Sequence, residues 1–230
     1  MKSILFLFAL TTLLACDLTG NKRPSKLIRE FSPSEQAAMD SARIDYGVSI
    51  QLRTHVPETF YLHKPEADLI NARSGFPPKQ HMFKGVAFKV APDSVSSRIA
   101  ALSKRIFPEG YMMYRSRRSF AEADEVCVLM TQQDPTAILR YEQTDGMNYG
   151  ITTDSLISVL DSWWQELDLN LTGASHDWVE ASIGKPPADW NELAKRVYAV
   201  CPDVVDQGTG SVDALAEEME RTRTLYLWWD

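Results

Sequence analysis

The feature that most constrains the fold is a change between two hydrophobic periods that begins after Gly85. Val86, Phe88 and Val90 alternate with other residues, as in a β-strand with one buried face. The apolar residues that follow within 94–106 are spaced by three or four positions, as on one face of an α-helix. A chain that changes period in this way is expected to pack strands and helices together in one domain.

The same two periods, with capping and turn residues, assign elements along the rest of the chain. The order strand-helix-strand-strand-helix occurs twice, which predicts an α+β fold with a mixed, largely antiparallel sheet and helices on one face. Two split βαβ (ferredoxin-like) units are one arrangement of this order. The expected helices are 33–45, 94–106, 135–141, 154–167, 190–201 and 212–219. The expected strands are 48–52, 59–62, 86–90, 111–115, 126–130, 148–151, 169–173, 178–183 and 225–229.

The first sixteen residues predict export to a bacterial envelope. Lys2 precedes an apolar run over 4–14, which is too short to span a bilayer and is typical of a secretory signal. Leu13-Leu14-Ala15-Cys16 resembles a lipobox, in which Cys16 is acylated and becomes the new N-terminus. The alternative is an unmodified Cys16 close to a cleaved signal. Asp17 resembles the signal that retains a lipoprotein at the periplasmic face of the inner membrane.

The domain organisation follows from this start. Four cations within 17–31 would be attracted to anionic lipids near an anchor, although the same segment also suits a plain soluble linker. The expected parts are a signal peptide (1–15), a lipidated Cys with a flexible tether (16–32), an N-terminal helix with an irregular segment (33–82) and an α+β domain (83–230).

Composition excludes some classes of protein. The apolar share of 44% and the charged share of 24% are ordinary for a globular chain. Without residues 1–15 the chain has 23 Lys and Arg against 31 Asp and Glu, a formal net charge of −8. This acidic balance gives no basic field for nucleic acid. We therefore expect a membrane contact through the lipid and a protein partner, and no nucleic-acid partner.

Motifs with a known catalytic geometry are absent. The sequence has no phosphate-binding GxxxxGK[ST], no HExxH, no CxxC and no GxSxG. Cys127 lies in an apolar strand and Cys201 at a helix C-terminus, so both are expected to be buried, unreactive thiols. His176 and Glu180 have the spacing to meet a metal on a strand, but a solvated hairpin end is the favoured interpretation. We expect no cofactor and no metal.

Carboxylates gather near the C-terminus. Asp203, Asp206 and Asp230, together with Gln207, fall at the ends of expected elements. Close carboxylates can share a proton or bind a hard cation. The structural alternative, which is favoured, is that Asp203 and Asp206 cap turns. All six tryptophans follow residue 160, where core packing explains most of them.

Several short motifs in this part of the chain occur in a characteristic order. Together they resemble the bacterial family catalogued as domain of unknown function 4253, most clearly over 138–230 and extending back to about residue 80. The resemblance implies a shared fold and shared motif positions, and no known reaction. It makes Asn148, Tyr149, Asp203, Asp206, Gln207, Trp229 and Asp230 the candidate binding residues. The motifs are Asn148-Tyr149-Gly150-Ile151, Asp177-Trp178-Val179-Glu180, Cys201-Pro202-Asp203, Asp206-Gln207-Gly208 and Trp228-Trp229-Asp230.

Three hypotheses of function remain after these exclusions. The first is a membrane-anchored lipoprotein with a binding domain, of the immunity or interaction-partner type, without enzymatic activity. The second is an envelope enzyme that uses the Asp203, Asp206 and Asp230 carboxylates, with or without a divalent ion. The third is a structural envelope lipoprotein. The missing catalytic motifs favour the first.

Overall fold

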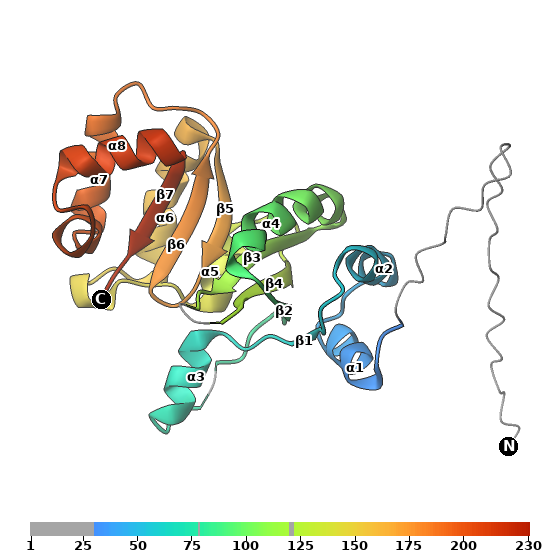
Figure 1. Cartoon of the computed structure of the whole chain (residues 1–230). Helices are drawn as coiled ribbons and strands as arrows, with labels where there is room; N and C mark the ends of the chain where they lie inside the picture. Colours follow the sequence, from blue (N-terminus) through green and yellow to red (C-terminus); the bar gives the residue numbers. More distant parts are fainter. Residues whose placement is uncertain (1–29, 78, 120–121) are drawn as a thin grey trace, which may run out of the picture.

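A computed structural model describes residues 30–77, 79–119 and 122–230. The described residues form one seven-stranded sheet in the order β1-β2-β4-β3-β5-β6-β7, in which only β3 and β5 pair in parallel (Figure 1). The expected α+β class with a mixed, largely antiparallel sheet is therefore confirmed. The strands are β1 Tyr61–Leu62, β2 Val86–Val90, β3 Tyr111–Arg117, β4 Asp124–Met130, β5 Leu169–Ala174, β6 Trp178–Ile183 and β7 Thr224–Trp228.

Helices occur before and between these strands. Short 3₁₀ turns (η1 and η2) and a π-helix (η3) complete the described elements. The α-helices are α1 Pro33–Ser41, α2 Tyr46–His55, α3 Glu66–Arg73, α4 Pro92–Ile106, α5 Thr136–Glu142, α6 Thr153–Leu167, α7 Trp190–Val200 and α8 Val212–Thr222. The remaining helical segments are η1 Phe107–Glu109, η2 Met147–Tyr149 and η3 Val204–Thr209.

Strand β4 lies in the interior of the sheet, between β2 and β3. Its side chains alternate between two cores: Val126 and Val128 pack on one face, and Cys127 and Leu129 pack on the other. All four are fully buried. The unbroken apolar run of this strand is what a strand with two covered faces requires.

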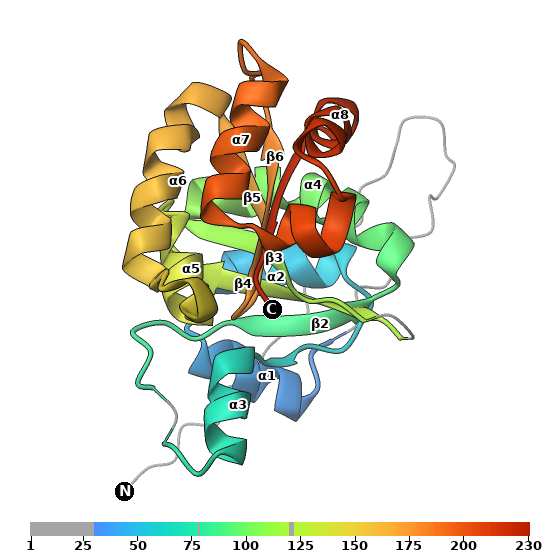
Figure 2. The same ribbon diagram turned by 90° about the vertical axis from the view of Figure 1, so that its left-hand side faces the viewer.

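Helices cover both faces of the sheet. Helices α1, α2 and α4 pack over β2, β4 and β3 on one face, and α5 to α8 pack on the opposite face (Figures 1 and 2). The expectation that helices would lie on one face is wrong. Hydrophobic period shows that an element has a buried side, but it does not show which face of the sheet receives that side.

The coverage is uneven along the sheet. Strands β5, β6 and β7 bury Leu171, Ala181 and Leu227 against α6, α7 and α8. Their opposite face carries polar or half-exposed residues such as Thr172 and Glu180. This face has α4 only along one side, as Figure 1 shows, and it forms a wall of the groove described below.

Helix starts were predictable where a side chain caps the backbone. Ser32 and Glu35 form the expected capping box at α1, with Ser32 Oγ accepting from Glu35 N and Glu35 Oε2 accepting from Ser32 N. Asp189 and Ser211 cap α7 and α8 through their side-chain oxygens. The predicted starts of these three helices are confirmed.

Two local predictions were wrong, and one helix was missed. Residues 48–52 form part of helix α2. Val48 and Leu52 are buried one helical turn apart, and the β-branched Val48 and Ile50 gave this segment the composition of a strand. Helix α3 was not predicted, since it buries none of its residues and has no apolar stripe. Residues 148–151 begin within the 3₁₀ turn η2 and form no strand. The second expected βαβ unit therefore lacks its opening strand.

The predicted signal peptide, Cys16 and the tether up to residue 29 lie outside the described residues. Within 30–77, 79–119 and 122–230, no helix has both the length and the apolar content that a transmembrane span requires.

Candidate functional site

Most of the predicted binding residues meet around Asp203, at the start of the π-helix η3. Its side chain is buried, and both carboxylate oxygens accept hydrogen bonds. Oδ1 accepts from the Tyr149 hydroxyl at 2.6 Å and from Gln207 Nε2 at 2.9 Å. Oδ2 accepts from the backbone N–H of Asp230 at 3.0 Å. We call Asp203 and these three partners the Asp203 cluster.

Hydrogen bonds set the charge state of this cluster. Burial raises the pKa of the Asp203 carboxyl, but the bonds from Tyr149, Asp230 N and Gln207 outweigh it and leave that pKa below its usual value. The same contact raises the pKa of Tyr149 to about 12, since an anionic neighbour disfavours a second anion. Asp203 is therefore an ionised acceptor whose oxygens serve three internal donors.

The other predicted residues lie near the Asp203 cluster with different contacts. Asn148 donates its side-chain amide to the Asp230 carbonyl. The Trp229 ring is buried, donates from Nε1 to the Val200 carbonyl at 3.1 Å, and packs so close to Gly146 that an added Cβ would lie 2.8 Å from it. The structure thus brings Asn148, Tyr149, Asp203, Gln207 and Asp230 into one hydrogen-bonded network, with Trp229 beside it.

Asp206 does not join this network. Its carboxylate accepts from the Tyr198 hydroxyl at 3.1 Å on the exposed side of η3. Across the described parts of the chain, no group of three or more His, Cys, Asp or Glu side chains is placed to hold a metal ion. The geometry of the Asp203 cluster is suited to fixing the C-terminal strand against η2 and η3.

The two described cysteines are buried and unpaired. Cys201 Sγ donates to the Trp228 carbonyl at 2.8 Å and accepts from the Trp228 N–H at 3.1 Å. Burial raises the pKa of Cys201 to about 11 and that of Cys127 well above its usual value. Neither thiol is poised as a nucleophile. The Cys201 thiol instead satisfies the backbone N–H and carbonyl of Trp228 at the free edge of β7.

A buried ionic network that joins β1, β3, β4 and α5 was not predicted from the sequence. His63 Nε2 bonds to Glu142 Oε1 at 2.9 Å, and His63 Nδ1 lies 3.0 Å from Glu125 Oε1. The Tyr114 hydroxyl also donates to Glu142, and the Tyr61 hydroxyl donates to Glu125. We call these five residues the His63 network. No sequence signal marks it, because its members lie on four elements and a loop.

Charge compensation holds the His63 network together. Burial lowers the pKa of His63, but the two glutamates outweigh it and raise that pKa to about 9. Burial raises the pKa of Glu125, but bonds from His63 and Tyr61 outweigh it and lower that pKa to about 2. The His63 and Glu142 side chains have no exposed surface. The network therefore holds a buried cation between two carboxylates, an arrangement in which loss of either partner leaves an uncompensated buried charge.

His176 forms a second, half-exposed cluster at the end of the β5–β6 hairpin. Its Nδ1 lies 3.4 Å from Asp177 Oδ1 and 3.7 Å from Glu66 Oε2. Glu180, its proposed metal-binding companion, instead pairs with Arg115 and with Arg118. The favoured interpretation of His176 as a hairpin-end residue agrees with this geometry. Contact with α3 through Glu66 was not foreseen.

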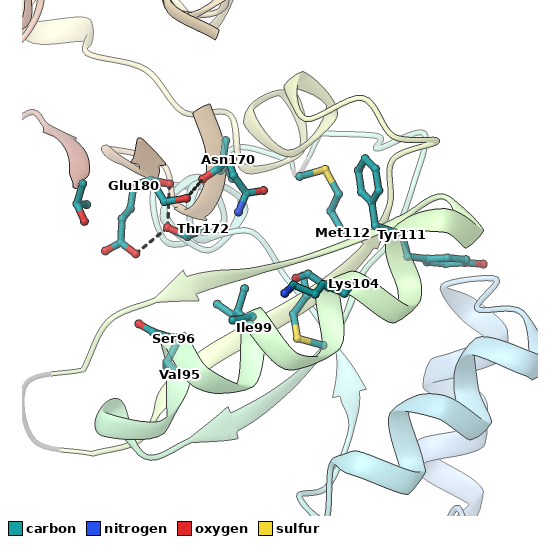
Figure 3. A pocket seen from close by; sticks show the side chains of 16 residues that line it. Val95, Ser96, Ile99, Lys104, Tyr111, Met112, Asn170, Thr172 and Glu180 are labelled. Carbon is teal, nitrogen blue, oxygen red and sulfur yellow. Dashed lines mark hydrogen bonds between the residues drawn. The ribbon is translucent and has the colours of Figure 1, made fainter. Parts of the chain in front are cut away.

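A groove of about 590 Å³ opens between α4 and the uncovered face of β5, β6 and β7 (Figure 3). Its volume lies within the range of about 300–1,000 Å³ that is common for ligand pockets. One wall is mainly apolar and the other carries polar side chains. The first wall consists of Val95, Ser96, Ile99, Ala100, Ser103, Lys104 and Phe107 with Tyr111, Met112 and Met113. The second consists of Asn170, Leu171, Thr172, Glu180, Ser182 and Thr224.

Charges on the two walls are balanced differently. Glu180 on the sheet wall accepts from Thr172 Oγ1 at 2.9 Å and from two arginines, so its charge is compensated. Lys104 on the helix wall is exposed and forms no ion pair with a described carboxylate. Figure 3 places Lys104 on α4 across from Thr172 and Glu180. An acidic group in the groove would therefore meet an unpaired ammonium group.

Comparison with known proteins matches residues 126–230 to the family described as "Domain of unknown function (DUF4253)". This part of the chain is a domain of that family. The match begins at Val126, within β4, whereas the resemblance was expected to extend back to about residue 80. Comparison with curated proteins and comparison with solved structures gave no match.

Proposed function

We propose that this protein is a lipid-anchored binding protein that holds an amphipathic helix of a partner protein in the groove beside α4. The observation that carries the proposal is the groove itself, which combines an apolar helix wall with a polar sheet wall. A binding domain of the immunity type is one form of this proposed function. The Asp203 cluster then supports the sheet instead of binding the partner.

The shape of the helix wall supports a helical occupant. Ser96, Ala100 and Ser103 are small residues that repeat at helical spacing along the side of α4 that faces the groove. Small side chains let a second helix approach closely, in the way that ridges pack into grooves. Phe107 ends this row and is 43% exposed, so it offers an apolar surface at one end. Recognition of an amphipathic helix in such a groove is a recurring mode.

Charge specifies the occupant further. With Glu180 compensated by Arg115 and Arg118, the unpaired charge on the groove walls is that of Lys104. We therefore propose that the bound helix presents apolar side chains to α4 and an Asp or Glu to Lys104. Complementary charges of this kind contribute mainly to specificity and to the rate of association.

The proposed location depends on Cys16. We propose that the chain is anchored by acyl chains on this residue in a bacterial envelope, at the periplasmic face of the inner membrane if Asp17 acts as a retention signal. Two or more acyl chains give stable membrane attachment. Metabolic labelling with palmitate tests this: wild type should be labelled and Cys16→Ala should not. If the wild type is not labelled, the proposed anchor is contradicted, and the proposal for the groove is not affected.

An enzyme that uses Asp203, Asp206 and Asp230 has less support from the geometry. Both oxygens of Asp203 already serve internal donors, and Asp206 bonds to Tyr198. A purely structural envelope lipoprotein would not need the groove. The groove therefore separates the binding proposal from both alternatives.

The direct test places a photo-crosslinking amino acid at Ser103, inside the groove, in cells of the native host. A protein adduct should form there, and it should disappear when Ala100→Trp fills the groove or Lys104→Glu reverses its charge. The matched control carries the same crosslinker at the exposed Glu217 on α8. An adduct that forms equally at both positions, or that survives both groove substitutions, would contradict the proposal.

A further inference from the structure

The segment between β1 and β2 presents apolar side chains to solvent. We call residues 64–77 and 79–84 the α3 arm. Ile70, Phe76 and Met82 of this arm are 38%, 65% and 88% exposed, and helix α3 buries none of its residues. Single exposed apolar residues are normal on a protein surface. Three within one short segment that lacks a core of its own need an explanation.

Cations accompany these apolar residues. Lys64, Arg73, Lys79 and Lys84 are all exposed. None of them forms an ion pair with a carboxylate among the described residues. This contrasts with the formal net charge of −7 for the chain as a whole. The α3 arm is therefore a locally basic surface on an acidic protein.

The carboxylates of the α3 arm point the other way, toward the domain. Glu66 Oε2 accepts from Ser175 Oγ at 3.0 Å. Asp68 accepts from Gln143 Nε2 at 3.0 Å and from His81 Nε2 at 2.7 Å. These bonds fix the arm with its acidic side inward. On its exposed side the arm carries the cations Lys64, Arg73, Lys79 and Lys84 together with Ile70, Phe76 and Met82, beside neutral polar residues such as Ser74 and Gln80.

The α3 arm lies at the same end of the molecule as α1, the first described helix. Helix α1 follows the first described residue, Glu30, and Figures 1 and 2 both show α1 and α3 at the lower end of the view. A membrane anchor that precedes α1 would bring this end toward the lipid surface.

We propose that the α3 arm docks on an anionic lipid bilayer, with its cations at the headgroups and with Ile70, Phe76 and Met82 in the interfacial layer. Charge complementarity favours a bilayer as the occupant. The rest of this acidic protein is repelled by an anionic surface, whereas the cations of the α3 arm are attracted to it. Amphipathic segments that combine basic and apolar residues bind membranes in this way. The inference rests on the membrane location proposed above, and it adds a second contact that orients the groove relative to the bilayer.

The first test measures the partition of the full chain, carrying Cys16→Ser so that no acyl chain contributes, onto phosphatidylcholine vesicles with and without phosphatidylglycerol. The arm variant is Arg73→Glu/Lys79→Glu/Lys84→Glu. The control variant, Arg105→Glu/Lys185→Glu/Arg221→Glu, has the same net charge and alters exposed positions elsewhere. Each cation near an anionic surface changes the partition coefficient about fivefold, so the partition of the arm variant onto anionic vesicles should fall at least about tenfold. The control variant should lose much less.

The second test distinguishes membrane contact through the α3 arm from membrane contact through the N-terminal apolar run. In the Cys16→Ser chain both remaining described cysteines are buried, so Met82→Cys adds one accessible site for a polarity-sensitive dye. Dye emission should shift to the blue on anionic vesicles, and the same dye on Glu217→Cys should not respond. An unshifted dye at position 82 on bound protein, or equal losses in the two triple variants, would overturn the proposal and point to a protein partner or a second copy for this arm.

Failure of this inference differs from failure of the proposed function. If the crosslink at Ser103 persists while both vesicle tests fail, the groove proposal stands and the α3 arm is not a membrane contact. Lys104→Glu lies outside the arm and should leave the dye response at position 82 unchanged.

Discussion

The His63 network and the Asp203 cluster both join distant parts of the chain, but they treat charge differently. The His63 network places a cation between two carboxylates with no access to solvent. The Asp203 cluster satisfies one carboxylate with neutral donors, and its Tyr149 is 44% exposed. The first therefore depends on proton binding near neutral pH, whereas the second depends on hydrogen-bond donors that do not titrate there.

Removal of the buried cation should give the largest effect. His63→Ala leaves Glu125 and Glu142 without their shared partner, and breaking a buried ionic pair by removing one side costs about 3–5 kcal/mol. Urea unfolding of the full chain measures the free energy of unfolding. A loss below about 1 kcal/mol would show that the network contributes little to stability.

The pH dependence of the free energy of unfolding also tests the contribution of the His63 cation. The pKa of His63 in the folded protein, about 9, lies above its unfolded value near 6.5. Its contribution is fully present below about pH 6.5 and is lost as the pH rises toward 9, which amounts to about 3 kcal/mol in total. Stability should therefore fall between pH 6.5 and 8.5 in wild type. His63→Gln, measured in the same way, should lack this fall.

The Asp203 cluster should give a smaller effect without this pH dependence. Asp203→Ala leaves three donors without their acceptor and should cost about 2 kcal/mol, since each buried unsatisfied group is destabilising. Asp206→Ala is the matched control, because its exposed carboxylate accepts one bond, from Tyr198. Equal losses in both variants, measured by thermal unfolding, would show that the cluster has no special role.

The smallest effect is expected at the edge of β7. Cys201→Ala removes the thiol that bonds to both backbone groups of Trp228, and it should cost about 1 kcal/mol. Cys201→Ser retains a donor and an acceptor at this position and serves as the comparison. Hydrogen exchange at the Trp228 amide should accelerate in the alanine variant. An unchanged exchange rate there would count against this role of the thiol.

Local patterns predicted most elements of this fold because capping residues and hydrophobic period act over a few positions. Ser32 with Glu35, and the stripe of α6, are examples in which sequence and structure agree. Helix α3 could not be found in this way, since polar bonds to Ser175, Gln143 and His81 hold it instead of a buried stripe. Ser175 and Gln143 lie far along the chain from α3, where no local signal reaches.

The candidate site was predictable only in part for the same reason. Family motifs indicated the residues that meet around Asp203, but not that internal donors would occupy its oxygens. The His63 network joins residues 63, 125 and 142, whose spacing has no period. The groove depends on which face of β5 to β7 lacks helices, and this is decided by tertiary packing.

The matched family region starts inside β4, and this has a practical consequence for anyone who expresses that region alone. A fragment that begins at Val126 would include β4 but neither of its neighbours, β2 and β3. Both long edges of that strand would then be open, and open edges recruit other chains. We expect such a truncation to aggregate, so the unit to clone begins at α1.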